Sequence, residues 1–222
     1  MTVLEHPVDV TLAITAARQQ IAGQTLANRF VPMLEAGAIP REKLRWLAGE
    51  LHRLVLSDRR SFALAASRFP AAPSGDLFLA MADGEGQALR FLMDFATALG
   101  MTEQDLRAYE PRPLAQAYPA YLTQTSLYGS RSDLALALLA NVEESGGYSS
   151  RVADALQSRY GFEDQAVAHF RYFADTPQEL LDQAATTLAT GLSEGDDPAA
   201  AVRTARMVRA YEITFWNTLA AG

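Results

Sequence analysis

The spacing of apolar residues constrains this chain most, because they recur at steps of three and four along nearly its whole length. Two clear examples are the run Phe78, Met81, Ala88, Leu92, Phe95, Leu99 and the run Ala201, Ala205, Val208, Phe215, Leu219. This spacing places side chains on one face of an α-helix. No stretch alternates with period two over the length of a strand. The sequence therefore predicts an all-α fold.

Helix-start signals divide the chain into about eight helical segments. Thr102 with Asp105, and Ser130 with Asp133, have the spacing of capping pairs at helix starts. The expected helices cover residues 8–34, 41–69, 76–99, 102–108, 114–128, 132–159, 163–174 with 177–191, and 198–219. The connections between them are short. We therefore expect residues 1–222 to form a single all-α domain.

Composition excludes several classes of function. The net charge is −7 and the pI is about 5.0, which argues against nucleic acid as the main partner. The chain has no cysteine, so disulfides, thiolate metal sites and a cysteine nucleophile are excluded. The longest apolar runs are far shorter than the roughly 20 residues of a membrane span, and Met1–Val10 lacks a signal pattern. We expect a cytoplasmic protein that binds neither nucleic acid nor a membrane.

Glutamates interrupt the apolar helix faces. Glu85 and Glu212 fall within the two runs given above, and Glu143 falls within a third, from residue 136 to 146. A buried carboxylate is costly unless it is neutralised, hydrogen-bonded or bound to something. Burial also raises its pKa towards the range of a useful acid or base. We expect Glu85, Glu212 and either Glu143 or the adjoining Glu144 to be catalytic carboxylates in a polar site inside the bundle.

Further residues are candidates for substrate contacts beside these glutamates. They are Glu50, Tyr148, His169, Tyr172 and Phe215. His169 lies on an apolar face, where a structural core histidine is the simpler interpretation. Gly146 and Gly147 fall inside an expected helix, where each costs about 1 kcal/mol relative to alanine. Close approach of another helix, a kink, space for a ligand and a plain helix break are all consistent with this pair.

A metal site would rest mostly on carboxylates, because the chain has three histidines. Di-iron sites in helix bundles use about four carboxylates and two histidines, often spaced Glu-x-x-His. That spacing does not occur in this sequence. We therefore expect no metal ion and no other cofactor. A reduced iron site that uses Glu85, Glu143 or Glu144, and His169 is the alternative.

Three segments resemble the heme oxygenase-like superfamily, in particular its TenA and PqqC branch. They are residues 30–46, residues 84–100 and the ending Glu212-x-x-Phe215-Trp216. The resemblance implies a heme oxygenase-like bundle of about seven to eight helices, a small-molecule substrate and often a homo-oligomer. The ending resembles the TenA tail, in which the glutamate is catalytic, and so implies that role for Glu212.

The chain also departs from its relatives. The usual TenA cysteine is absent, and Glu143 or Glu144 lies in the helix where a TenA subgroup uses glutamate. Aligned on Tyr172, the ligand positions of the di-iron oxidases hold Thr176, Leu180 and Gln183. We therefore predict a metal-independent hydrolase or oxidase of TenA/PqqC type that acts on a small nitrogen-heterocyclic molecule. The alternatives are an iron-dependent oxidase with a degenerate site and a non-catalytic ligand-binding or regulatory protein on the same fold.

Overall fold

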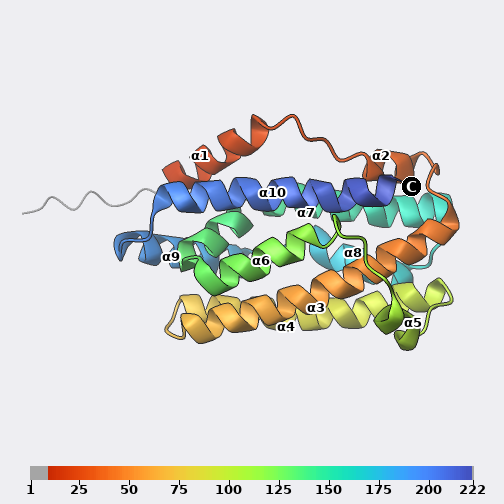
Figure 1. Cartoon of the computed structure of the whole chain (residues 1–222), viewed down its shortest axis with the longest axis horizontal. Helices are drawn as coiled ribbons and strands as arrows, with labels where there is room; N and C mark the ends of the chain where they lie inside the picture. The colour runs from red at the N-terminus through yellow and green to blue at the C-terminus, as the bar shows by residue number, and fades with distance from the viewer. Residues whose placement is uncertain (1–9, 222) are drawn as a thin grey trace, which may run out of the picture.

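Long helices carry the architecture of residues 10–221, the part of the chain that the computed structural model describes (Figure 1). The helices are α1 (Val10–Ala22), α2 (Phe30–Glu35), α3 (Leu44–Arg68), α4 (Ser74–Ala98), α5 (Glu103–Ala108), α6 (Ala117–Tyr128), α7 (Arg131–Tyr160), α8 (Asp164–Ala174), α9 (Gln178–Ser193) and α10 (Pro198–Ala220). A short 3-10 turn, Arg41–Lys43, precedes α3. No strand occurs among the described residues. The predicted all-α fold is confirmed.

Six helices form a closed ring around the centre of the molecule. In order around the ring, α3 contacts α4, α4 contacts α8, α8 contacts α7, α7 contacts α10, α10 contacts α6, and α6 returns to α3. Figure 1 shows α7 and α10 on one side of the bundle, α3 and α4 on the other, and α6 and α8 between them. The ring brings the faces of all six helices towards one interior space.

The apolar core is divided into two clusters along the long axis of the bundle. One contains Phe95, Leu156 and Trp216, and the other contains Phe78 and Leu134. The four longest helices, α3, α4, α7 and α10, each pack one half of their length into the first cluster and the other half into the second. Asp58, Glu85 and Glu212 each lie between the residues that their helix contributes to one cluster and those that it contributes to the other, which places a polar interior between the two clusters.

The predicted helix 8–34 is wrong, because the structure divides it into α1 and α2. Residues 23–29 leave the helix and are held by α10. The amide of Asn217 donates to the Ala27 carbonyl over 3.0 Å, and its oxygen accepts from the Arg29 backbone N–H over 2.8 Å. Asn28 accepts from the Val31 backbone N–H at the start of α2. These long-range contacts replace the hydrogen bonds of a continuous helix.

The glycine pair in α7 does not break the helix, which runs without interruption from Arg131 to Tyr160. A Cβ on Gly146 would lie 3.1 Å from the carbonyl oxygen of Ala174, whereas a Cβ on Gly147 would meet nothing within 4 Å. Gly146 therefore permits the end of α8 to approach α7 closely, as one of the alternative interpretations anticipated.

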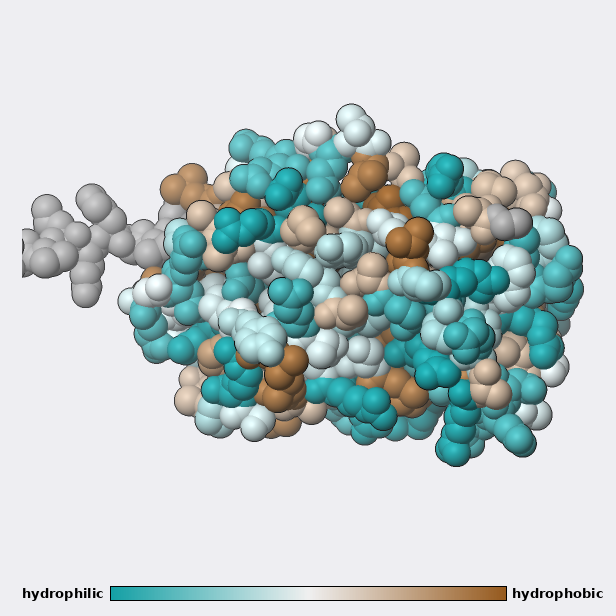
Figure 2. Space-filling view, viewed as in Figure 1, coloured by the Kyte–Doolittle hydropathy of each residue, from teal (hydrophilic) through white to brown (hydrophobic). Residues whose placement is uncertain are grey.

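Figure 2 shows a surface that is mainly hydrophilic or neutral, with hydrophobic residues scattered over it. No helix within residues 10–221 has the length and apolar character of a membrane span. Residues 1–9, which include the expected helix start at residue 8 and most of the segment inspected for a signal pattern, lie outside the described residues.

Candidate active site

A cavity of about 820 Å³ lies between the helices of the ring, and α9 with the segment before it also contributes to its lining. Its size is typical of small-molecule sites. Its walls are largely apolar. The polar groups that line it include Asp58 from α3, Glu85 from α4, Tyr118 from α6, Asn141 and Ser145 from α7, His169 and Tyr172 from α8, and Glu212 from α10. Polar groups thus converge on one space from all six helices.

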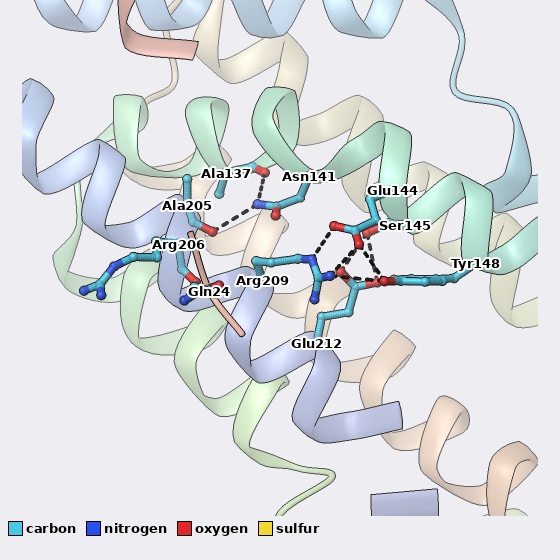
Figure 3. Close-up of polar contacts among 10 residues, drawn as sticks. All are labelled: Gln24, Ala137, Asn141, Glu144, Ser145, Tyr148, Ala205, Arg206, Arg209 and Glu212. Atoms are coloured by element: carbon cyan, nitrogen blue, oxygen red, sulfur yellow. Dashed lines mark hydrogen bonds and ion pairs between the residues drawn. The ribbon is translucent and has the colours of Figure 1, made fainter. Parts of the chain in front are cut away.

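Glu212 faces this cavity from α10, with Phe215 one turn further along the helix. The Ser145 hydroxyl lies 2.9 and 2.8 Å from the two carboxylate oxygens of Glu212 and donates its hydrogen to them. Figure 3 shows this contact between α7 and α10. Burial raises the pKa of Glu212, and the hydrogen bond from Ser145 opposes part of that rise. A carboxyl group in this state is suited to proton transfer.

Asp58 and Glu85 form a second acidic pair in the same cavity. Asp58 is 3% exposed. Burial raises the pKa of Glu85 to about 8. Burial also raises the pKa of Asp58, and the neighbouring Glu85 carboxylate raises it further. The protonation of one carboxyl group therefore depends on that of the other, and the pair retains a proton at neutral pH.

Tyr118 connects the two acidic parts of the cavity. Burial raises the pKa of its hydroxyl, and the charges of Asp58, Glu212 and Glu85 raise it further, in that order. All three carboxylates are therefore close enough to act on the same hydroxyl. The phenol stays protonated and is available as a hydrogen-bond donor inside the cavity.

His169 lines the cavity as a neutral imidazole. Its Nδ1 lies 2.9 Å from the carbonyl oxygen of Ala88, and this oxygen only accepts hydrogen bonds, so Nδ1 carries the proton. Burial lowers the pKa of His169 to about 4, and its ring packs edge-on against Phe170 and Phe173. At neutral pH its Nε2 is therefore a hydrogen-bond acceptor.

The other predicted catalytic carboxylates do not reach the cavity. Glu143 is wrongly predicted to face the core, because its side chain is 86% exposed and lies 3.8 Å from Arg18. Glu144 forms a two-pronged ion pair with Arg209 and accepts a 2.5 Å hydrogen bond from the Tyr148 hydroxyl (Figure 3). Burial alone would raise the pKa of Glu144, but these donors lower it overall. Glu144 and Tyr148 connect α7 to α10 beside the cavity rather than within it.

Glu50 is fully buried away from the cavity. It accepts hydrogen bonds from the Tyr109 hydroxyl over 2.9 Å, the Arg112 backbone N–H over 2.7 Å and the Gln116 amide over 2.5 Å. The Tyr109 ring packs so closely on Gly49 that a Cβ there would lie 2.4 Å from it. Glu50 thus fastens the segment before α6 onto α3, although we predicted it to contact substrate.

Of the nine predicted site residues, the structure brings five to the cavity: Glu85, Glu212, His169, Tyr172 and Phe215. Four further polar residues of the cavity were not predicted, namely Asp58, Tyr118, Asn141 and Ser145. Asp58 carries the same signal as the glutamates that were recognised, because it interrupts an apolar run of α3 from Leu51 through Val55 to Phe62. Tyr118 and Ser145 carry no comparable signal.

The cavity residues do not match a metal site. No cluster of three or more histidine, aspartate or glutamate side chains suited to a metal ion occurs within residues 10–221. His169 is the one histidine in the described lining of the cavity, and Glu85, the acidic residue that α4 contributes to it, is paired with Asp58. The only histidine near the amino end, His6, lies outside the described residues. The side chains of the described lining therefore fit neither an iron site nor a heme ligand.

A family model described as the TENA/THI-4/PQQC family matches residues 16–221. The chain belongs to this family. No curated protein sequence is significantly similar to it. The match to a TENA/THI-4/PQQC model confirms the predicted resemblance over nearly the whole described chain.

Solved structures of TenA homologues share the same fold. A TenA homologue from P. horikoshii OT3 has a TM-score of 0.70 at 19% identity, covering 96% of this chain and 98% of that one. A putative TenA-like thiaminase from Sulfolobus solfataricus has a TM-score of 0.55 at 12% identity, covering 98% and 97%.

A domain of unknown function with a heme oxygenase-like fold from Shewanella denitrificans has a TM-score of 0.73 at 14% identity, covering 96% of this chain and 93% of that one. At these identities the likeness establishes the fold alone. Within the TENA/THI-4/PQQC family, this protein therefore has the heme oxygenase-like architecture, and the prediction of that architecture is confirmed.

Proposed function

We propose that this protein is a TenA-type enzyme in which Glu212 transfers a proton to or from a small organic molecule held in the central cavity. The observation that carries the proposal is the state of Glu212, a partly buried carboxyl group in the cavity that has a raised pKa and accepts a hydrogen bond from Ser145. Membership of the family supports an enzyme of this type.

The other cavity groups support binding and orientation of the substrate. Neutral His169 presents an acceptor and protonated Tyr118 a donor. Phe215 supplies an apolar surface beside Glu212. Such an arrangement suits a nitrogen heterocycle, whose flat ring packs on an aromatic side chain while its nitrogens form hydrogen bonds.

The test compares Glu212→Gln with the wild type on thiamin and on simpler amino-substituted nitrogen heterocycles. Thiamin is included because one structural neighbour is described as a putative thiaminase. Loss of a positioned acid–base group lowers kcat by roughly 10²- to 10⁴-fold. Glu143→Gln, which changes an exposed carboxylate on α7, is the matched control and retains full turnover.

Full turnover by Glu212→Gln would contradict the proposal. A fall in turnover that is accompanied by a large fall in melting temperature would assign Glu212 to folding instead. A protein that binds these heterocycles but turns none of them over would be the non-catalytic ligand-binding alternative.

A further inference from the structure

We propose that Asp58 and Glu85 bind a cationic nitrogen of the ligand, and that this nitrogen is a primary ammonium carried on an apolar body. The inference rests on the proposed function, because it takes the central cavity as the place where the small molecule lies. It adds a second recognition element to that cavity, separate from the carboxyl group of Glu212 that Ser145 holds.

The first observation is that the acidic pair has oxygens without partners. Asp58 Oδ1 and Glu85 Oε2 are both shielded from solvent, and neither has a hydrogen-bond partner within the described part of the chain. Buried polar atoms are nearly always paired, and leaving one unpaired is costly. Glu50, which is buried on the same helix as Asp58, has both oxygens occupied by donors. The two cavity carboxyls are therefore prepared to accept hydrogen bonds from outside the chain.

The second observation is the imbalance of charge around the cavity. Five acidic residues line it among the residues described, namely Asp58, Glu85, Asp175, Glu179 and Glu212. Arg171 is the one arginine or lysine in that described lining, and it is directed elsewhere, donating to Asp154 and Gln157 over 2.7 Å each. A ligand that carries positive charge complements such a surface, and an anionic ligand does not.

The third observation concerns the type of cation. Structural zinc takes four protein ligands and calcium takes six to eight oxygens, and no group of three or more histidine, aspartate or glutamate side chains suited to a metal ion occurs within residues 10–221. A primary ammonium instead presents three N–H donors and forms charge-assisted hydrogen bonds with carboxylates. The side chains of Leu54, Val55 and Met81 line the same cavity, so the group that carries the nitrogen meets an apolar surface.

The test uses benzylamine, which is protonated at neutral pH, and benzyl alcohol, a neutral molecule of similar size. Binding is measured by calorimetry or ligand-observed NMR on the full chain. We expect the wild type to bind benzylamine at least tenfold more tightly than benzyl alcohol, because the amine adds charge-assisted hydrogen bonds. Asp58→Asn and Glu85→Gln each lower benzylamine affinity about tenfold and leave benzyl alcohol affinity unchanged.

The matched control is Asp83→Asn, which removes an exposed carboxylate two residues before Glu85 on α4 and keeps the preference for the amine. The double variant D58N/E85Q removes both carboxyl groups of the pair, and its melting temperature is measured to show that it remains folded. Equal affinity of the wild type for the two probes overturns this inference and leaves the role of Glu212 untouched. A preference for the amine that survives D58N/E85Q in a folded protein also overturns it. Failure of both probes to bind overturns the cavity as a ligand site and this inference with it.

Discussion

Helix α3 contains two buried carboxylates, one with all its hydrogen-bond partners inside the protein and one without. Glu50, near the start of the helix, accepts three hydrogen bonds from the segment before α6. Asp58, two turns later, has an oxygen without a partner and faces a cavity. Both interrupt an apolar face, and both are almost completely buried. An acidic residue on a core-facing helix stripe therefore identifies a polar interior, but only its partners decide whether it fastens two segments together or remains available to a ligand.

Glu50→Ala gives the largest expected change in stability. It removes the acceptor shared by the Tyr109 hydroxyl, the Arg112 backbone N–H and the Gln116 amide. Breaking a buried, charge-assisted network in this way lowers the free energy of unfolding by about 3–5 kcal/mol. Urea denaturation followed by circular dichroism measures it. A variant of unchanged stability that has lost turnover would place Glu50 in the catalytic site and remove the contrast.

Glu85→Gln changes how stability depends on pH. The pKa of Glu85 is raised from 4.5 to about 8 in the folded chain. Between these values the folded state keeps a proton that the unfolded chain has released, so the free energy of unfolding falls as pH rises. We expect the wild type to lose about 3–4 kcal/mol more than Glu85→Gln between pH 5 and pH 8.

Urea titrations at pH 5 and pH 8 measure this difference in slope. Asp83→Asn is the control, because this exposed residue on the same helix leaves the slope as it is in the wild type. Equal slopes in the wild type and in Glu85→Gln would show that the acid pair is fully ionised in the folded protein.

Ser145→Ala gives a smaller effect, confined to catalysis. The Ser145 hydroxyl favours the ionised form of Glu212, so its loss raises the pKa of Glu212 further. We expect kcat/KM to fall roughly tenfold, equivalent to one charge-assisted hydrogen bond, and the limb of the pH–rate profile that reports Glu212 to move to higher pH. A uniform loss of rate at every pH, with no displacement of that limb, would contradict this role.

Glu143→Gln gives the smallest expected effect. Its side chain is 86% exposed and its contact with Arg18 spans 3.8 Å, so the ion pair contributes little. The free energy of unfolding stays within about 0.5 kcal/mol of the wild type. A larger loss of stability would show that the exposed Glu143 carboxylate contributes to folding.

Helical periodicity and caps were sufficient to predict the all-α fold, because they depend on neighbouring residues. The predicted starts at Thr102 and Ser130 are confirmed as capping boxes. The break between α1 and α2 was not predictable in this way, since Asn217 makes the contacts that hold residues 27–29. Local pattern contains no information on a partner nearly the whole chain away.

The residues of the candidate site were likewise predictable only where local sequence pattern was enough. Glu85 and Glu212 were recognisable because each interrupts an apolar run, and Asp58 carried the same signal unrecognised. Glu144 could not be interpreted from its own helix, because Arg209 of α10 determines where its carboxylate points. Composition and spacing thus indicate which side chains are expensive to bury, whereas tertiary contacts decide which of them are already satisfied.

The hydrogen bonds between Asn217 and residues 27 and 29 also affect the order in which contacts can form during synthesis. The partners of Asn217 lie 188 and 190 residues earlier in the sequence, and translation adds about 5–20 residues per second. The part of their docking surface that belongs to α10 is therefore absent for roughly 10–40 seconds after they are made. For that interval the nascent chain carries α1, whose Ala13 and Ala17 are buried in the finished protein, without the helix α10 against which α1 packs. The contacts that α1 and residues 27–29 make with α10 are therefore the last of their contacts that can form.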